Sequence, residues 1–97
     1  MEFDWNPAKC AKTIADRAVD FAEILPGFED PLRKVTIDSR KDYGEVRFNM
    51  LAKCRGRIFH VTFTMRGAIT WIISARKANK REQRRYEQTY DWARRLG

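Results

Sequence analysis

Between Leu32 and Ile73 the chain alternates apolar and polar side chains in four runs, and short stretches that contain glycine separate these runs. Alternation of this kind is typical of β-strands that bury one face. The connections, which contain Gly44, Gly56 and Gly67, are too short for crossover helices. The pattern therefore predicts four antiparallel strands joined as a meander. Their apolar positions are Val35 and Ile37; Val46, Phe48 and Met50; Phe59, Val61, Phe63 and Met65; and Ile69, Trp71 and Ile73.

The segment before the meander begins with a strand signal and a helix signal. Phe3 and Trp5 alternate with acidic residues, which predicts a short first strand. Asn6 is a good N-cap and proline is tolerated at the first helical position, so a helix is predicted from Pro7 to near Arg17. Its predicted inward stripe is Ala11, Ile14, Ala15 and Ala18.

Two capping patterns predict the remaining helices. Asp20, with Glu23 three residues later, predicts a second short helix. Asn79, with Glu82 three residues later, predicts a final helix that continues to about Arg95. The predicted apolar stripe of this final helix is Tyr86, Thr89, Tyr90, Ala93 and Leu96.

The order of these elements, β-α-α-β-β-β-β-α, predicts the fold class. We expect one small α+β domain over residues 1–97, with a basic C-terminal helix. Its antiparallel sheet, made of the short N-terminal strand and the four-strand meander, packs on the two N-terminal helices. A chain of 97 residues with 43% apolar side chains has room for one modest core. The chain has no signal-peptide pattern and no membrane-spanning stretch, which predicts a cytoplasmic protein.

Positive charge is concentrated in the second half of the chain. The formal net charge is +7, yet residues 1–50 hold eight basic and ten acidic side chains, whereas residues 51–97 hold twelve basic and three acidic ones. This asymmetry indicates a polyanionic partner. Charge alone leaves nucleic acid, an anionic membrane and an acidic protein open.

Cysteine and histidine are too sparse for a metal centre. Cys10 and Cys54 are isolated, and His60 is the single histidine, so a zinc site with three or four protein ligands is not expected. We predict two reduced thiols that pack as small hydrophobic side chains, with no metal and no cofactor.

Strand parity predicts a sheet with one apolar face and one polar, cationic face. The predicted core face contains Phe59, Val61, Phe63, Ile69, Trp71 and Ile73. The predicted polar face contains Arg47, Asn49, Lys53, His60, Thr62, Thr64, Arg66, Thr70, Ser74 and Arg76. The same parity places Leu51, Ile58 and Ile72 on the polar face, where either a protein partner or the final helix would cover them.

Ordered motifs along most of the chain resemble one known family. The motifs are Trp5-Asn6-Pro7-Ala8-Lys9, Phe28-Glu29-Asp30-Pro31, Gly44-Glu45-Val46-Arg47, Thr64-Met65-Arg66-Gly67, and Ile72-Ile73-Ser74-Ala75-Arg76-Lys77-Ala78 followed by Glu82 and Tyr86. This set resembles the BrnT family, toxins of bacterial type II toxin–antitoxin systems. The resemblance implies a RelE-like ribonuclease that cleaves RNA without a metal ion and is inhibited by a BrnA-type antitoxin. The chain departs from the family's pattern at Thr13, at Asp16-Arg17-Ala18 and at Trp71.

The chemistry that this resemblance implies needs positive charge at the phosphate and two proton transfers. Arginine suits the first task, because its planar fork binds two phosphate oxygens and stays charged. We therefore assign phosphate binding to Arg66 and Arg76, which lie on consecutive strands of the polar face. Ser74, on the same face, is either a hydrogen-bond donor to phosphate or ribose, or a small strand residue.

Candidates for proton transfer are fewer. Glu45 is either a catalytic base or an ordinary partner of Arg47 or Lys53. Lys9, which matches the Trp-Asn-Pro-x-Lys motif, either reaches the catalytic site or lies on a solvated helix face. His60 titrates in the right pH range, although the family resemblance gives it no marked position.

The remaining basic residues are predicted to follow the RNA backbone without reading its sequence. The predicted RNA-binding residues are Arg47, Lys53, Lys77, Lys80, Arg81, Arg84, Arg85 and Tyr86. For the final helix the alternative is an ordinary solvated face. Tyr86 either stacks on a base or packs on the sheet.

The predicted partners are RNA and a BrnA-type antitoxin, in a hetero-oligomeric complex that involves no membrane. Two other functions fit the same sequence. One is a non-enzymatic nucleic-acid-binding module that uses the same basic face. The other is an interaction protein whose positive surface docks an acidic partner.

Overall fold

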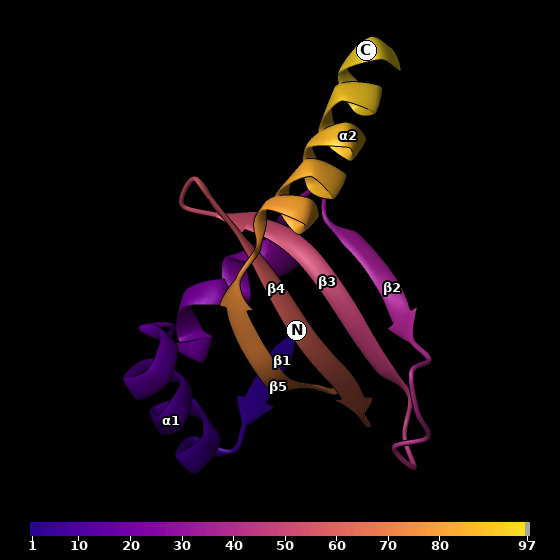
Figure 1. The fold of residues 1–97 in the computed structure, drawn as a ribbon. Helices are drawn as coiled ribbons and strands as arrows, with labels where there is room; N and C mark the ends of the chain where they lie inside the picture. The colour runs from indigo at the N-terminus through magenta and orange to yellow at the C-terminus, as the bar shows by residue number, and fades with distance from the viewer. Residues whose placement is uncertain (97) are drawn as a thin grey trace.

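The computed structural model describes the backbone of residues 1–96 and the side chains of residues 1–88. Its elements follow the predicted order (Figure 1). They are β1 (Glu2–Trp5), α1 (Pro7–Arg17), the 3-10 helix η1 (Phe21–Glu29), β2 (Lys34–Asp38), β3 (Arg47–Cys54), β4 (Arg57–Arg66), β5 (Ile69–Lys77) and α2 (Lys80–Leu96).

The five strands form one sheet in the order β1-β5-β4-β3-β2. Strands β2 to β5 pair antiparallel, as the meander pattern predicts. The prediction of a purely antiparallel sheet is wrong, because β1 pairs parallel to β5. Residues Glu2–Trp5 lie opposite Ile69–Ile72, so β1 covers only the first part of the β5 edge and the sheet is mixed.

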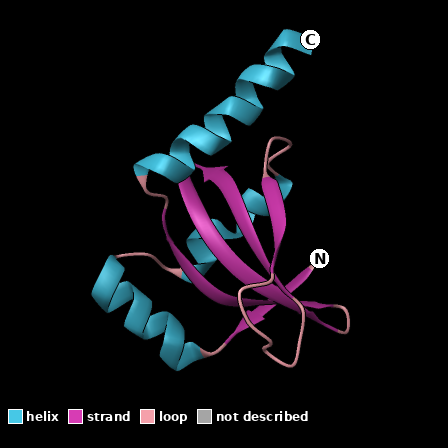
Figure 2. Ribbon diagram, turned by 45° about the vertical axis from the view of Figure 1, so that its right-hand side comes forward, coloured by secondary structure: helices cyan, strands magenta, loops and turns pink. Residues whose placement is uncertain are grey.

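The main core lies between η1 and one face of the sheet (Figure 2). Phe21 and Ile24 of η1 are fully buried there against β3, β4 and β5. An aromatic contact joins η1 to the sheet, because Phe28 packs edge-on against Phe63 of β4 at 5.0 Å between ring centres. Gly27 lets η1 approach closely, since a Cβ atom there would lie 2.9 Å from the Cβ atom of Ala52.

A β-bulge in β5 changes the predicted faces of the sheet. Thr62 lies opposite Ser74, but the next residue, Phe63, lies opposite Ile72, so Ile73 has no cross-strand partner in the register. Two residues of β5 therefore face one residue of β4, and the alternation of side chains reverses at this point. The core face receives Thr70 and Ile72, and both are 1% exposed.

The same bulge moves Trp71 to the opposite face, where it lies across from Thr64. The predicted core position of Trp71 and the predicted polar-face positions of Thr70 and Ile72 are therefore wrong. An alternating pattern that continues through Ile73 does not predict this reversal of faces, because the sequence of β5 contains no glycine that marks a bulge.

The second face of the sheet is covered at one end by α2. Leu51 of β3 and Ile58 of β4 form a small apolar cluster with Ala78 and Tyr86. The sequence left open whether a protein partner or the final helix covers these residues. The final helix covers Leu51 and Ile58. Ile72 belongs to the main core instead.

Capping fixes where both α-helices begin. The Asn6 side chain accepts hydrogen bonds from the backbone N–H groups of Ala8 and Lys9, which caps α1. Asn79 and Glu82 form the predicted reciprocal capping box at the start of α2, with distances of 2.8 and 3.0 Å. In the predicted stripe of α2, Tyr86 is buried, while the side chains of Thr89, Tyr90, Ala93 and Leu96 lie outside the described residues.

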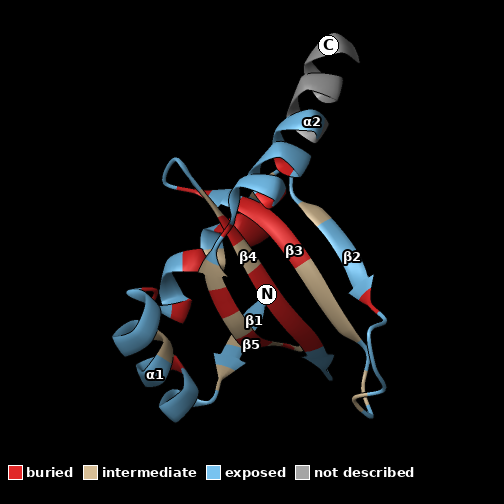
Figure 3. Ribbon diagram, in the orientation of Figure 1, coloured by how far each residue is buried: buried red, intermediate tan, exposed pale blue. Residues whose placement is uncertain are grey.

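The predicted inward stripe of α1 is wrong, because Ala11, Ile14, Ala15 and Ala18 are all exposed. Figure 3 shows α1 exposed over most of its length, and Cys10 is its buried residue. The helix lies beside the edge of β5 rather than across the sheet, so Cys10 is the α1 residue that reaches the core. None of the described helices is long and apolar enough to span a membrane.

Candidate functional site

A cleft of about 310 Å³ lies between α1 and the part of β5 that β1 leaves uncovered, and we call it the α1–β5 cleft. Its lining residues are Lys9, Lys12, Thr13, Asp16, Arg17, Ser74, Ala75 and Arg76. Four of these side chains are basic and one is acidic, and Asp16 lies 3.7 Å from the ammonium group of Lys12. An excess of positive charge in a concave site favours an anion.

Lys9 reaches the cleft from the first turn of α1. Partial burial lowers the pKa of its ammonium group, and the nearby positive charge of Arg47 lowers it further. A lysine with a lowered pKa gives up its proton more readily than an ordinary lysine. This residue therefore combines positive charge with the capacity to act as an acid.

Arg76 lies at the far end of the cleft and is held by Glu82 of α2. Its two terminal nitrogens donate to the two carboxylate oxygens of Glu82 at 2.7 and 2.8 Å. This hydrogen bonding lowers the pKa of Glu82 to about 2, so that the carboxylate is ionised at neutral pH. A guanidinium has five N–H donors, and the pair with Glu82 leaves donors for a further acceptor.

His60 lies directly opposite Arg76 on β4. Its Nε2 atom is 3.9 Å from a carboxylate oxygen of Glu82. Burial and the charge of Arg76 lower the pKa of His60, while Glu82 opposes them. A histidine with a lowered pKa is neutral at physiological pH, when it can accept a proton.

Ser74 lies on the same face of the sheet as Arg76 and His60, in the next row of paired residues. It is opposite Thr62, which in turn is opposite Asn49, and the hydroxyl of Thr62 donates to the amide oxygen of Asn49 at 2.9 Å. The row of Asn49, Thr62 and Ser74 is thus a polar strip that crosses three strands beside Arg76 and His60.

A second group of side chains, which we call the aromatic–arginine cluster, lies at the other end of this face. Its members are Tyr43, Glu45, Arg47, Arg66 and Trp71. The guanidinium carbon of Arg66 is 4.4 Å from the centre of the Trp71 ring, and that of Arg47 is 4.0 Å from the centre of the Tyr43 ring. Both arginines approach one oxygen of Glu45, at 3.5 and 3.8 Å.

The predicted pairing of Arg66 with Arg76 on one phosphate is wrong. Arg76 lies opposite His60, and Arg66 lies six residues further along β4. At about 3.3 Å per residue this separates the two arginines by roughly 20 Å. Of the five predicted catalytic residues, Lys9, Ser74 and Arg76 line the cleft, whereas Arg66 and Glu45 belong to the aromatic–arginine cluster.

The predicted RNA-binding residues are distributed more widely. Lys77, Lys80, Arg81, Arg84 and Arg85 are exposed at the end of β5 and along α2. Base stacking by Tyr86 is not possible in this conformation, because the side chain is 3% exposed and packs on the sheet. Its hydroxyl group donates to the carboxylate of Asp30 at 2.7 Å.

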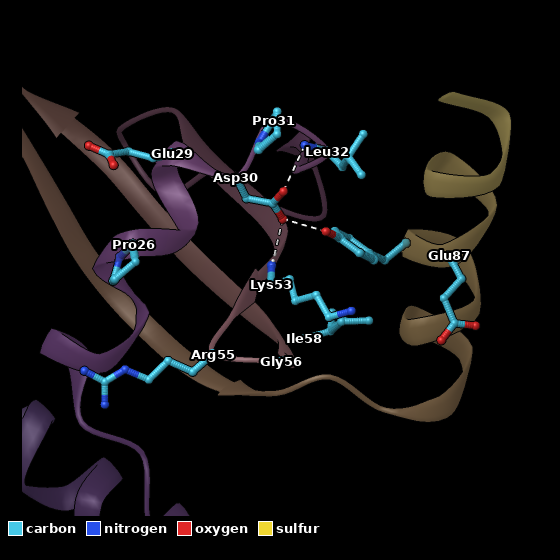
Figure 4. Close-up of a pocket in the computed structure, with 11 residues that line it drawn as sticks. Pro26, Glu29, Asp30, Pro31, Leu32, Lys53, Arg55, Gly56, Ile58 and Glu87 are labelled. Atoms are coloured by element: carbon cyan, nitrogen blue, oxygen red, sulfur yellow. Dashed lines mark hydrogen bonds between the residues drawn. The ribbon is translucent and has the colours of Figure 1, made fainter. Parts of the chain in front are cut away.

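A larger pocket of about 590 Å³ lies between the end of η1 and α2 (Figure 4), and Lys53 lies on its wall. Its surface is largely apolar and includes Leu32 and Ile58. Asp30 is held inside it by hydrogen bonds from Tyr86 and from the backbone N–H groups of Leu32 and Lys53. This largely apolar pocket carries acidic side chains as well as Lys53 and Arg55, so it lacks the excess of positive charge found in the α1–β5 cleft. Size alone therefore does not identify the functional site.

Glu82 is the residue that sequence reasoning missed. The capping-box pattern and the family motif both contain it, but neither indicated a contact with Arg76. Its second role, which is to hold Arg76 and to face His60, depends on α2 folding back over β3 and β4. Within the described part of the chain, no three His, Cys, Asp or Glu side chains form a group that could hold a metal ion.

Comparison with known protein families gives a match over most of the chain. Residues 5–82 match the model of the family described as the ribonuclease toxin, BrnT, of type II toxin–antitoxin systems. The matched segment runs from Trp5, the last residue of β1, through β5 to the first residues of α2, and it contains all of the residues that line the cleft. No curated protein matches the chain.

Proposed function

This chain belongs to the BrnT family of ribonuclease toxins of type II toxin–antitoxin systems, and from this membership we propose that it cleaves RNA within the strand and without a metal ion. The observation that carries the proposal is the convergence of Lys9, Ser74 and Arg76 in one cationic cleft. His60 and Glu82 adjoin Arg76. Together these side chains supply the charge and the titratable groups that cleavage by the 2′-hydroxyl requires.

In the proposed reaction, neutral His60 accepts the proton of the 2′-hydroxyl group. The 2′-oxygen then bonds to the adjacent phosphorus, and the bond from phosphorus to the 5′-oxygen breaks. Lys9 donates a proton to the departing 5′-oxygen. The products are one RNA end with a 2′,3′-cyclic phosphate and another with a 5′-hydroxyl.

Arg76 and Ser74 stabilise the transition state of this reaction. The guanidinium of Arg76 faces the negative charge that builds up on the phosphate oxygens, and the Ser74 hydroxyl donates a further hydrogen bond. Glu82 fixes the orientation of Arg76 before substrate binds. Such preorganisation lowers the barrier, because the enzyme does not reorganise during the reaction.

Cleavage in the presence of EDTA tests the metal-free mechanism. We expect the purified protein to cut single-stranded RNA in EDTA and to leave a 2′,3′-cyclic phosphate or the 3′-phosphate formed by its hydrolysis. The termini are identified by mass spectrometry of the fragments. Activity that disappears on chelation and returns with Mg²⁺ would contradict the mechanism, and salt-sensitive binding without cleavage would favour the non-enzymatic alternative.

We further propose that the antitoxin implied by the family is an acidic, BrnA-type protein that covers the cationic face. The protein should stop growth when expressed alone and be neutralised by the product of the neighbouring open reading frame. Co-purification and competition with labelled RNA measure the interaction. A neighbour that neither restores growth nor co-purifies would contradict this part of the proposal.

A further inference from the structure

Trp71 presents an aromatic ring on the same face of the sheet as the α1–β5 cleft. The β-bulge at Ile73 is responsible, because it turns Trp71 away from the core while Ser74 stays on the polar face. The row of Thr64 and Trp71 is adjacent to the row of Thr62 and Ser74, about 7 Å away along β4. A nucleotide next to the one in the cleft can therefore reach Trp71.

The Arg66 side chain stacks on the Trp71 ring, and the two side chains form one layered surface. Its guanidinium carbon lies 4.4 Å from the centre of the Trp71 ring, and half of the Arg66 side chain is exposed. Aromatic rings and guanidinium planes are the surfaces on which proteins stack the bases of single-stranded RNA.

Charge distinguishes this surface from the cleft. Glu45 lies 3.5 Å from Arg66 and 3.8 Å from Arg47, so it offsets part of their positive charge. A phosphate would meet this carboxylate, whereas a neutral base would not be repelled by it. The aromatic–arginine cluster therefore suits a planar, uncharged ring, and the cleft suits the phosphate.

We infer that the Arg66–Trp71 pair is a base-stacking subsite, which holds a base of single-stranded RNA next to the phosphate in the α1–β5 cleft. This inference rests on the proposed function, because the cleft defines where the phosphate lies. The subsite would bind a base of the RNA, and the chemistry of cleavage does not require this contact. Double-stranded RNA cannot use the subsite, since its bases are already stacked and paired.

Binding to RNA that cannot be cleaved tests the subsite separately from the chemistry. The probe is a fluorescein-labelled, fully 2′-O-methylated RNA of about eight nucleotides, and its affinity is measured by fluorescence anisotropy. We expect Trp71→Ala to weaken binding roughly tenfold or more, because a lost base–aromatic contact has effects of this size. Trp71→Phe, which keeps a ring, should retain most of the affinity. Ile37→Ala removes an exposed apolar side chain from the edge strand β2 and serves as a control with unchanged affinity.

Single abasic sites, moved one position at a time along the probe, then identify the stacked base. One position should lower the affinity of the wild-type protein but have no further effect in Trp71→Ala, because both changes remove the same contact. Equal affinity of Trp71→Ala and wild type, or additive losses at every position, would overturn the inference. If abasic coupling is seen but ordinary RNA is not cleaved, the subsite stands and the proposed ribonuclease mechanism fails.

Discussion

The Arg76→Ala variant should lose about 10³-fold in the rate of RNA cleavage, while its affinity for RNA falls by no more than about tenfold. The reason is that Arg76 faces charge that develops mainly in the transition state, so that its removal raises the barrier more than it weakens the bound ground state. Single-turnover cleavage measures the rate, and anisotropy with 2′-O-methylated RNA measures the affinity.

Two further variants test whether Arg76 stabilises the transition state or only contributes a positive charge. Arg76→Lys keeps the positive charge but loses the planar fork that pairs with Glu82, so its cleavage rate should also fall strongly. Arg57→Ala removes an equal charge from an exposed position outside the cleft and the aromatic–arginine cluster, and its rate should stay close to that of wild type. Equal losses of rate and affinity in Arg76→Ala would reduce Arg76 to an ordinary phosphate contact.

The pair with Glu82 also affects stability, so the folding of Arg76→Ala must be measured. Removing the arginine leaves a largely buried carboxylate without its main partner, which costs about 1–3 kcal/mol. In wild type the pKa of Glu82 is lowered to about 2 from its ordinary value of about 4.5, mainly by the hydrogen bonds from Arg76. Its contribution to stability is therefore complete above about pH 4.5 and is lost as the pH falls through about 2. Thermal melts at neutral and acidic pH show whether the variant has lost this dependence.

Much of the fold could be predicted because its signals are local. Alternating side chains, short turns with glycine and two capping patterns are each contained within a few residues. The pairing of β1 with β5 was not predicted, because it joins residues that are more than 60 positions apart. The inward stripe of α1 was predicted wrongly for the same reason. The helix lies at an edge of the sheet, and this edge exists only in the assembled fold.

The candidate site was predicted only in part for a similar reason. Lys9 and Arg76 were identified as separate motifs, but their common cleft depends on β1 ending before Ser74, so that α1 takes its place beside β5. Arg66 and Arg76 were both assigned to phosphate binding because they share the polar face, although they lie at opposite ends of the β4–β5 hairpin. Trp71 was assigned to the core because the bulge at Ile73 has no sequence signal.

Lys9 offers the sharpest test of the assignment of acid and base. Lys9→Ala should lower the rate of cleavage by about 10²–10³-fold, because the 5′-oxygen would depart without a proton. Lys9→Arg keeps the charge, but its pKa is too high for efficient proton donation, and its rate should be nearly as low. Lys12→Ala removes the same charge from the same cleft, and it should weaken binding of RNA with little change in the rate at saturation.

A substrate with sulfur in place of the departing 5′-oxygen makes the test specific for proton donation. A thiolate leaves without protonation, because a thiol is far more acidic than an alcohol. The sulfur substrate should therefore restore the rate of Lys9→Ala and Lys9→Arg to near that of wild type, while Arg76→Ala stays slow with either substrate. If sulfur rescues none of the Lys9 variants, Lys9 binds the phosphate as a fixed charge, and a group other than Lys9 protonates the departing 5′-oxygen.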